Sequence, residues 1–153
     1  FRTIVAIAMG GFVRALHTQR QLVALISANS NVSLVLEQIA REMRTGFAFC
    51  DDSASCPPNE IFFTNATSEI ISYKYRDIGY GVILRQVTKR GVPGAEEQIS
   101  ASNVNIRYLN FVLGGGGVLP ARITIQLAVS PNSPGSIAEN VTNIQTTVSA
   151  RTF

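Results

Sequence analysis

The first third of the chain carries an apolar pattern with the period of an α-helix. Apolar side chains recur at helical spacing at Leu22, Leu25, Ile26, Val32, Leu36, Ile39 and Met43. No proline interrupts residues 1–56, and Gly46 follows two arginines as a C-terminal cap would. The pattern predicts one helix over residues 1–45, about 68 Å long at about 1.5 Å per residue. The pair Gly10–Gly11 is its one weak point, because glycine loosens a helix.

The later residues follow the period of β-strands. Apolar side chains alternate most clearly in 121–130, where Ile123, Ile125, Leu127 and Val129 share one face. Strands are expected over residues 60–66, 69–77, 80–91, 103–114, 121–130 and 139–152. In 103–114 the inward candidates are Val104, Ile106, Phe111 and either Tyr108 or Leu109. The first three strands read as an antiparallel meander, the last strand should pair with 121–130, and 114–117 and 131–136 are expected to be loops.

These patterns predict an α+β fold with a long N-terminal α-helix packed by its C-terminal half on a small antiparallel β-sheet. A sheet with one apolar face needs a cover, and the helical stripe is the only long one in the sequence. The residues expected to pack on the sheet are Val32, Leu36, Ile39 and Met43. A globular head would then cover 22–153, with helix 22–46, a cysteine loop 47–59 and sheet 60–153. Residues 1–21 would protrude from it.

The protruding segment is apolar but short. The chain is 46% hydrophobic and 15% charged, and part of this apolar excess lies in the opening residues. Arg2 and Arg14 leave eleven uncharged residues between them, which span only about 17 Å of a bilayer core about 30 Å thick. Packing against copies of itself is therefore the favoured alternative to a lone membrane span. The candidate assembly residues are Phe1, Ile4, Val5, Ala8, Gly10, Gly11, Phe12 and Leu16.

The charge distribution and the two cysteines bear on which partners and sites the sequence supports. The net charge of +3 lies entirely in residues 1–46, and no basic cluster with interleaved aromatic residues supports a DNA or RNA partner. Cys50 and Cys56 lack the further ligands that zinc needs, and their spacing differs from a redox CxxC pair. A structural disulfide is predicted, with two free thiols as the alternative. A disulfide would place this part of the chain outside the cytoplasm.

No constellation of residues indicates catalysis. His17, the only histidine, has no acidic residue within a helical turn, so it lacks a triad partner. Asp51 and Asp52 lack the spacing of a calcium loop, and the glycine run 114–117 lacks the Lys-Ser/Thr of a phosphate loop. We expect no catalytic residue, no metal and no cofactor, and we expect that the protein is not an enzyme.

Several segments together resemble the type IV pilin and pseudopilin superfamily of bacterial prepilin-type proteins. The segments are "SLVLEQIAREMRTG" at 33–46, the cysteine loop, and the strand sequences "LNFVLGGGG", "ARITIQLAVS" and "NIQTTVSAR". The resemblance implies a structural subunit that polymerises non-covalently into a surface filament through its N-terminal helix. It implies as partners copies of itself, an inner-membrane assembly platform with its motor ATPase, and a leader peptidase. It also implies residence in the bacterial inner membrane before assembly and on the cell surface afterwards.

The N-terminus departs from the family pattern. Arg2 follows Phe1, and Val5 stands where family members carry a glutamate. Two explanations stay open: Phe1 is the processed N-terminus of an atypical subunit, or the first dozen or so residues of the segment are missing. The alternatives to a filament shaft subunit are a minor pseudopilin that caps a type II secretion pseudopilus, and a soluble extracytoplasmic binding module with the helix as its stalk.

Overall fold

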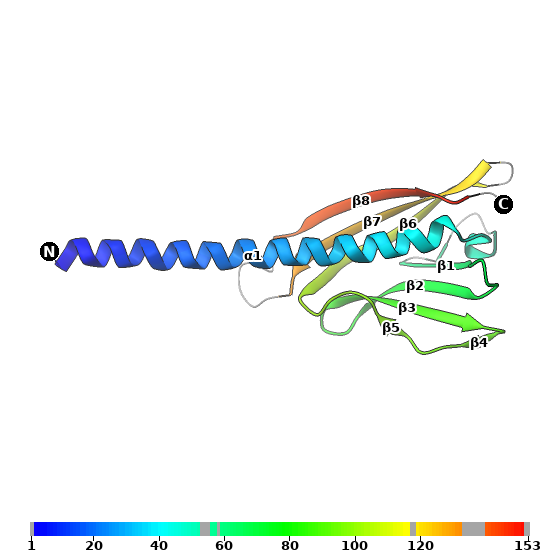
Figure 1. Ribbon diagram of the computed structural model, residues 1–153, viewed down its shortest axis with the longest axis horizontal. Coiled ribbons are helices and arrows are strands. Elements are labelled where there is room, and N and C mark those ends of the chain that lie inside the picture. The colour runs from blue at the N-terminus through cyan, green and yellow to red at the C-terminus, as the bar shows by residue number, and fades with distance from the viewer. Residues whose placement is uncertain (1, 53–55, 58, 117–118, 133–139, 152–153) are drawn as a thin grey trace.

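The computed structural model describes residues 2–52, 56–57, 59–116, 119–132 and 140–151 and has the expected α+β class (Figure 1). A single long helix leads into a head made of antiparallel strands. The elements are α1 (Arg2–Arg44), a short 3-10 helix η1 (Phe49–Asp52), β1 (Glu60–Thr64), β2 (Ile70–Asp77), β3 (Gly81–Lys89), β4 (Val92–Pro93), β5 (Glu97–Gln98), β6 (Val104–Gly116), β7 (Leu119–Pro131) and β8 (Thr142–Ser149).

Helix α1 runs without a break through Gly10 and Gly11, so the loosening predicted there is not seen in the single chain. It ends where the sequence places the cap, because the Gly46 N–H donates to the Met43 carbonyl at 3.1 Å. Gly46 is required at this point, since a β-carbon there would clash with the ring of Phe63. The N-terminal half of α1 projects beyond the head, and the C-terminal half lies along it (Figure 1).

The strands form two antiparallel sheets, whereas the sequence predicted one. The first has the order β1-β2-β3-β4, with β5 also pairing with β3, and the second has the order β6-β7-β8. The expected meander is present in β1–β3, and β8 pairs with β7 as expected. The prediction of a single sheet was wrong because β4 and β5 pair with the edge of β3 that a further strand would need. That edge is therefore closed to a ladder with β6.

The two sheets still meet closely at one end of β3. The backbone N–H of Gly81 donates to the side-chain oxygen of Asn105 at 2.9 Å. A β-carbon at Gly81 would collide with the Ile106 carbonyl oxygen and with the ring of Tyr75. Glycine therefore allows the two backbones to approach each other without a shared ladder.

Strand β6 contains an irregularity that the alternation could not fix. The register shifts between Ile106 and Tyr108, which inserts one extra residue into the strand. Leu109 is therefore fully buried, and Tyr108, the other candidate, is exposed. The glycine run also differs from its predicted loop, because β6 continues through Gly116 and pairs there with the start of β7. The predicted loop at 131–136 lies mostly outside the described residues.

One continuous apolar core joins α1 to both sheets. It contains buried residues from α1, η1, β1–β3 and β6–β8, together with Ala150. On α1 the core includes Ala28, Val32, Val35, Leu36, Ile39 and Met43. Three members of the predicted stripe do not take part in the core: Leu22 and Ile26 are 54% and 67% exposed, and Leu25 is half-buried. All three precede the first core residue of the helix, so the buried part of the helix begins later than the sequence pattern suggested.

Candidate functional site

The exposed half of α1 is the surface that the head leaves uncovered. Its described side chains include several large apolar groups, each more than two-fifths exposed: Met9, Phe12, Val13, Leu16, Leu22, Val23 and Ile26. Of the other predicted assembly residues, Gly10 and Gly11 are exposed on the same helix. Ile4, Val5 and Ala8 belong to α1, and Phe1 lies outside the described residues.

This surface has a distinct charge and hydropathy. No acidic residue precedes Glu37 in the sequence, whereas Arg2, Arg14 and Arg20 are all in this stretch. Among the described residues one helical segment, Met9–Arg44, is long and apolar enough to cross a membrane, with a mean hydropathy of 1.3.

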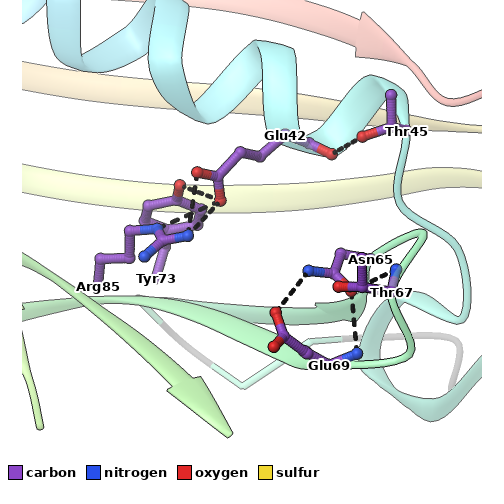
Figure 2. A network of polar contacts seen from close by, with 7 residues as sticks. All are labelled: Glu42, Thr45, Asn65, Thr67, Glu69, Tyr73 and Arg85. Carbon is purple, nitrogen blue, oxygen red and sulfur yellow. Dashed lines mark hydrogen bonds and ion pairs between the residues drawn. The ribbon is translucent and has the colours of Figure 1, made fainter. Parts of the chain in front are cut away.

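The C-terminal end of α1 is fastened to the first sheet by a polar cluster (Figure 2). Glu42 accepts a hydrogen bond from the hydroxyl of Tyr73 at 2.8 Å and ion-pairs with Arg85 at 3.1 Å. Tyr73 is fully buried, and burial followed by the Glu42 carboxylate raises the pKa of Tyr73 above its ordinary value of 10.0. The protonated Tyr73 hydroxyl therefore donates to Glu42, and Glu42 links the end of α1 to Tyr73 on β2 and to Arg85 on β3.

The point where α1 leaves the head is fastened by Asn103. Its side-chain oxygen accepts from Asn31 at 2.9 Å, and its side-chain nitrogen donates to the hydroxyl of Ser27 at 3.0 Å. Its carbonyl accepts from the backbone of Asn132 at 2.8 Å, which adds the end of the β7 strand. Both ends of the Asn103 amide therefore contact α1 at the point where its free half begins.

The cysteine loop lies beside the end of α1. Cys50 and Cys56 form a disulfide with a Cα–Cα distance of 5.3 Å, and no described cysteine is free. Cys50 is buried in the core, and the neighbouring Phe49 ring lies 5.2 Å from that of Phe63. The loop thereby closes the end of the core where the helix stops.

The turn between β1 and β2 is held by Asn65 (Figure 2). The Asn65 oxygen accepts from the backbones of Thr67 and Glu69, each at 2.9 Å, and its amide donates to the Glu69 carboxylate. Lys89 pairs with that carboxylate at 3.0 Å, and Lys89 followed by Asn65 lowers the pKa of Glu69. An asparagine two residues before a threonine is a signal for this kind of turn.

The sequence did not indicate the helix anchors. The stripe placed Val32, Leu36, Ile39 and Met43, which are all buried. Glu42 and Asn103 were missed because their partners come from strands far along the chain, and no local spacing reports such pairs.

The described residues include no candidate metal site. No three histidine, cysteine or acidic side chains among them gather closely enough to hold a metal ion. His17 lies exposed on the free half of α1. The main features of the described part are a head of antiparallel strands, side-chain contacts that hold α1 to it, and a half-helix with exposed apolar side chains, which we call the rod.

Comparison with known protein families, with characterised proteins and with solved structures finds no match to the chain. The likeness to pilins is therefore one of architecture. A long apolar N-terminal helix, antiparallel sheets and a disulfide are present together in one chain.

Proposed function

We propose that the protein is a structural subunit that polymerises non-covalently, through the exposed half of α1, into a pilus-like surface filament. The observation that carries the proposal is the row of large apolar side chains on that half, which no part of the described head covers. Exposed apolar surface of this extent marks a surface that binds a partner or a membrane. The proposed role is structural, with no reaction and no cofactor.

The head needs nothing from the exposed half. The first core residue on α1 is Ala28, and every other member of the core lies later in the chain. The anchors at Asn31, Glu42 and Asn103 also lie after the exposed half. Because no core contact depends on residues 1–20, these residues are available for a contact outside the subunit.

Lipid and other copies can cover the rod at different times. The apolar helix is long enough to hold the subunit in a membrane before assembly. Arginines at bilayer depth cost several kcal/mol by order of magnitude, so the rod gains by moving from lipid into a bundle of copies. The resemblance adds a leader peptidase and an inner-membrane assembly platform as partners, and the cell surface as the destination. Whether the subunit builds the shaft or caps a secretion pseudopilus belongs to the same proposal.

A second candidate is a membrane-anchored extracytoplasmic binding module. The hydropathy of Met9–Arg44 favours it, because a stalk with this composition could keep the head at a bilayer without assembly. The two candidates differ in what covers the rod in the final state: copies of the chain or lipid.

Removal of residues 1–20 tests the proposal against this alternative. After slow detergent removal the full chain should form filaments visible by electron microscopy. The truncated chain should remain a soluble monomer that unfolds at the same temperature as the head of the full chain. Filaments from the truncated chain would contradict a helix-driven polymer. A full chain that stays monomeric and partitions only into vesicles would favour the binding module.

A further inference from the structure

Strand β8 is the one long strand edge that stays open among the described residues of the head. On the far side of the first sheet, the backbone of Phe47 exchanges two hydrogen bonds of 2.9 Å with Thr64 of β1. The other edge of that sheet carries β4 and β5, which have two residues each, with Pro93 in β4. Strand β6 meets the first sheet where Gly81 donates to Asn105. Strand β8 ends the order β6-β7-β8 and lies on the outer side of its sheet (Figure 1).

The ladder between β7 and β8 shows which backbone groups of β8 are unused. The Ala150 N–H donates to the Ala121 carbonyl at 2.9 Å, so the even-numbered residues of β8 direct their backbone groups to β7. Asn143, Gln145 and Thr147 direct theirs outward. None of these outward N–H and C=O groups has a partner in the part of the chain that the structure describes. A row of such groups is a template for a further strand.

The sequence of β8 contains none of the features that usually protect an edge. Charged residues, proline and bulges are the common devices, whereas "TNIQTTVS" has neither a charge nor a proline. Its register with β7 runs without a shift from Thr142 to Ser149. On the side that faces the core, Ile144 and Thr146 are only half-buried, while Val148 is buried. A strand beside β8 would cover the two half-buried side chains.

Three arginines stand at the C-terminal end of this open edge. Arg122 lies opposite Ser149 in the ladder, and the Arg151 N–H donates to the Arg44 carbonyl at 3.1 Å. Arg44, Arg122 and Arg151 are all exposed, and none of them forms an ion pair with a described acidic residue. The end of α1 therefore closes the edge with positive charge that the described head does not neutralise.

We propose that the outer edge of β8 is a docking site for an extended segment of a different protein, which adds to the second sheet as an antiparallel strand. The segment carries β-branched residues in the row beside Ile144 and Thr146 and polar residues on the solvent side. Acidic residues precede it at the end that meets the arginines. Main-chain hydrogen bonds supply the affinity, and the side chains supply the specificity. The inference concerns the head alone and goes beyond the proposed assembly through α1.

A second copy of β8 is a poorer occupant than a foreign segment. Residues 140–151 contain no acidic residue, so the same strand from another copy would leave the three arginines without a counter-charge. A segment with acidic residues at one end neutralises them. Charge complementarity of this kind also sets the direction and the register of the docked strand.

A designed peptide tests the docking site on the full chain dispersed in detergent. In the sequence "DEVTVTVTV" the acidic residues reach the arginines when the threonines pair with Asn143, Gln145 and Thr147. N-methyl groups on the valines, whose N–H groups then point away from β8, keep the peptide from pairing with itself. The matched control carries its methyl groups on the threonines instead, which blocks pairing with β8. Fluorescence anisotropy should show at least about tenfold tighter binding of the first peptide; equal binding of the two would overturn the proposal.

Amide hydrogen exchange of the same samples identifies the mode of binding. The amides of Asn143, Gln145 and Thr147 should exchange fast in the free chain and about tenfold or more slowly with the peptide. The amides of Ile144 and Thr146 already donate to β7 and should change little. Equal slowing of both sets, or of neither, would overturn strand addition. Slowing of the outward amides with rising concentration of the chain alone would make a second copy the occupant and overturn the foreign segment.

Charge reversal tests the chemistry assigned to the segment. Arg151→Glu should weaken binding of the acidic peptide about tenfold and strengthen binding of a peptide in which lysines replace the acids. Arg90→Glu is the matched control, because it makes the same change at an exposed arginine after β3, and it should alter binding by less than about twofold. Equal effects of the two variants would overturn the acidic end. These measurements need no assembly, so a chain that never forms filaments would leave their outcome unchanged.

Discussion

Two leucines two positions apart on α1 have opposite environments. Leu36 is 8% exposed and belongs to the core, whereas Leu34 is 63% exposed and faces away from both sheets. Composition cannot separate them, but helical periodicity can, because a step of two residues turns the side chain by about 200°. The side of the helix thus decides whether a leucine stabilises the head or is available to a neighbour.

Replacement of Leu36 by alanine should destabilise the head, and the same change at Leu34 should not. Leu36→Ala removes a core side chain and should lower the free energy of unfolding by about 2–5 kcal/mol. Leu34→Ala is the matched control and should change it by less than about 0.5 kcal/mol. Urea unfolding of the chain that lacks residues 1–20 measures both. Equal losses would mean that the buried face has been assigned wrongly.

The hydroxyl of Tyr73 should contribute more to the free energy of unfolding than the hydroxyl of Tyr75. Tyr73→Phe leaves the fully buried ring in place and removes the donor to Glu42. The expected loss in the free energy of unfolding is about 1.5 kcal/mol, the low end for a hydrogen bond to a charged group, because Glu42 keeps partial contact with water. Tyr75→Phe is the control, with an expected change below about 0.5 kcal/mol. If Tyr73→Phe lowers the free energy of unfolding no more than Tyr75→Phe does, the hydrogen bond to Glu42 does not anchor the helix.

The sequence predicted each helix or strand that is long enough to show a regular apolar period. The helix and the six longer strands follow from stripes and alternation, and the strand ends fall within a few residues of those expected. Strands β4 and β5 have two residues each, too few to show a period. They nevertheless close the edge of β3, so the division into two sheets could not be read from the pattern. The shift at Arg107 was hidden likewise, because a bulge changes the face of later residues without changing their alternation.

Gly10 and Gly11 should make the free half of α1 less stable as a helix than alanine would at the same positions. A β-carbon at Gly10 or Gly11 would meet nothing within 4 Å, so alanine fits both positions. Each replacement should stabilise the helix locally by up to about 1 kcal/mol. Hydrogen exchange of the detergent-dispersed chain should be slower around residues 9–14 in the double variant, with exchange in the head unchanged. Unchanged exchange in the segment would mean that it is already held by other contacts.

Loss of the disulfide should lower the free energy of unfolding of the head while leaving α1 helical. The bond closes a short loop, so the chain-entropy model gives about 2–3 kcal/mol of stabilisation. Replacement of both Cys50 and Cys56 by serine should lower the free energy of unfolding by that amount, measured in urea. Mass spectrometry of unreduced, alkylated protein is the companion measurement. Two alkylated thiols in the native protein would contradict the bond itself.

The whole molecule is a head of antiparallel strands from which the N-terminal half of α1 projects (Figure 1). The rod continues the helix that crosses the core, and Glu42 and Asn103 hold that helix at the end and at the exit from the head. A bend between rod and head would have to break the exit anchor at Asn103. The geometry therefore fits repeated placement of identical heads around a central bundle. The sequence suggested this division, but the direction of the rod and the face it exposes required the packed structure.

Electron cryomicroscopy of the full chain after detergent removal tests the central claim most directly. The account predicts filaments whose cross-section shows a central bundle of α1 helices with the heads around the outside. The truncated chain without residues 1–20 should give only separate head-sized particles under the same conditions. Filaments whose centre is formed by the heads, with the rods directed outward, would contradict the account.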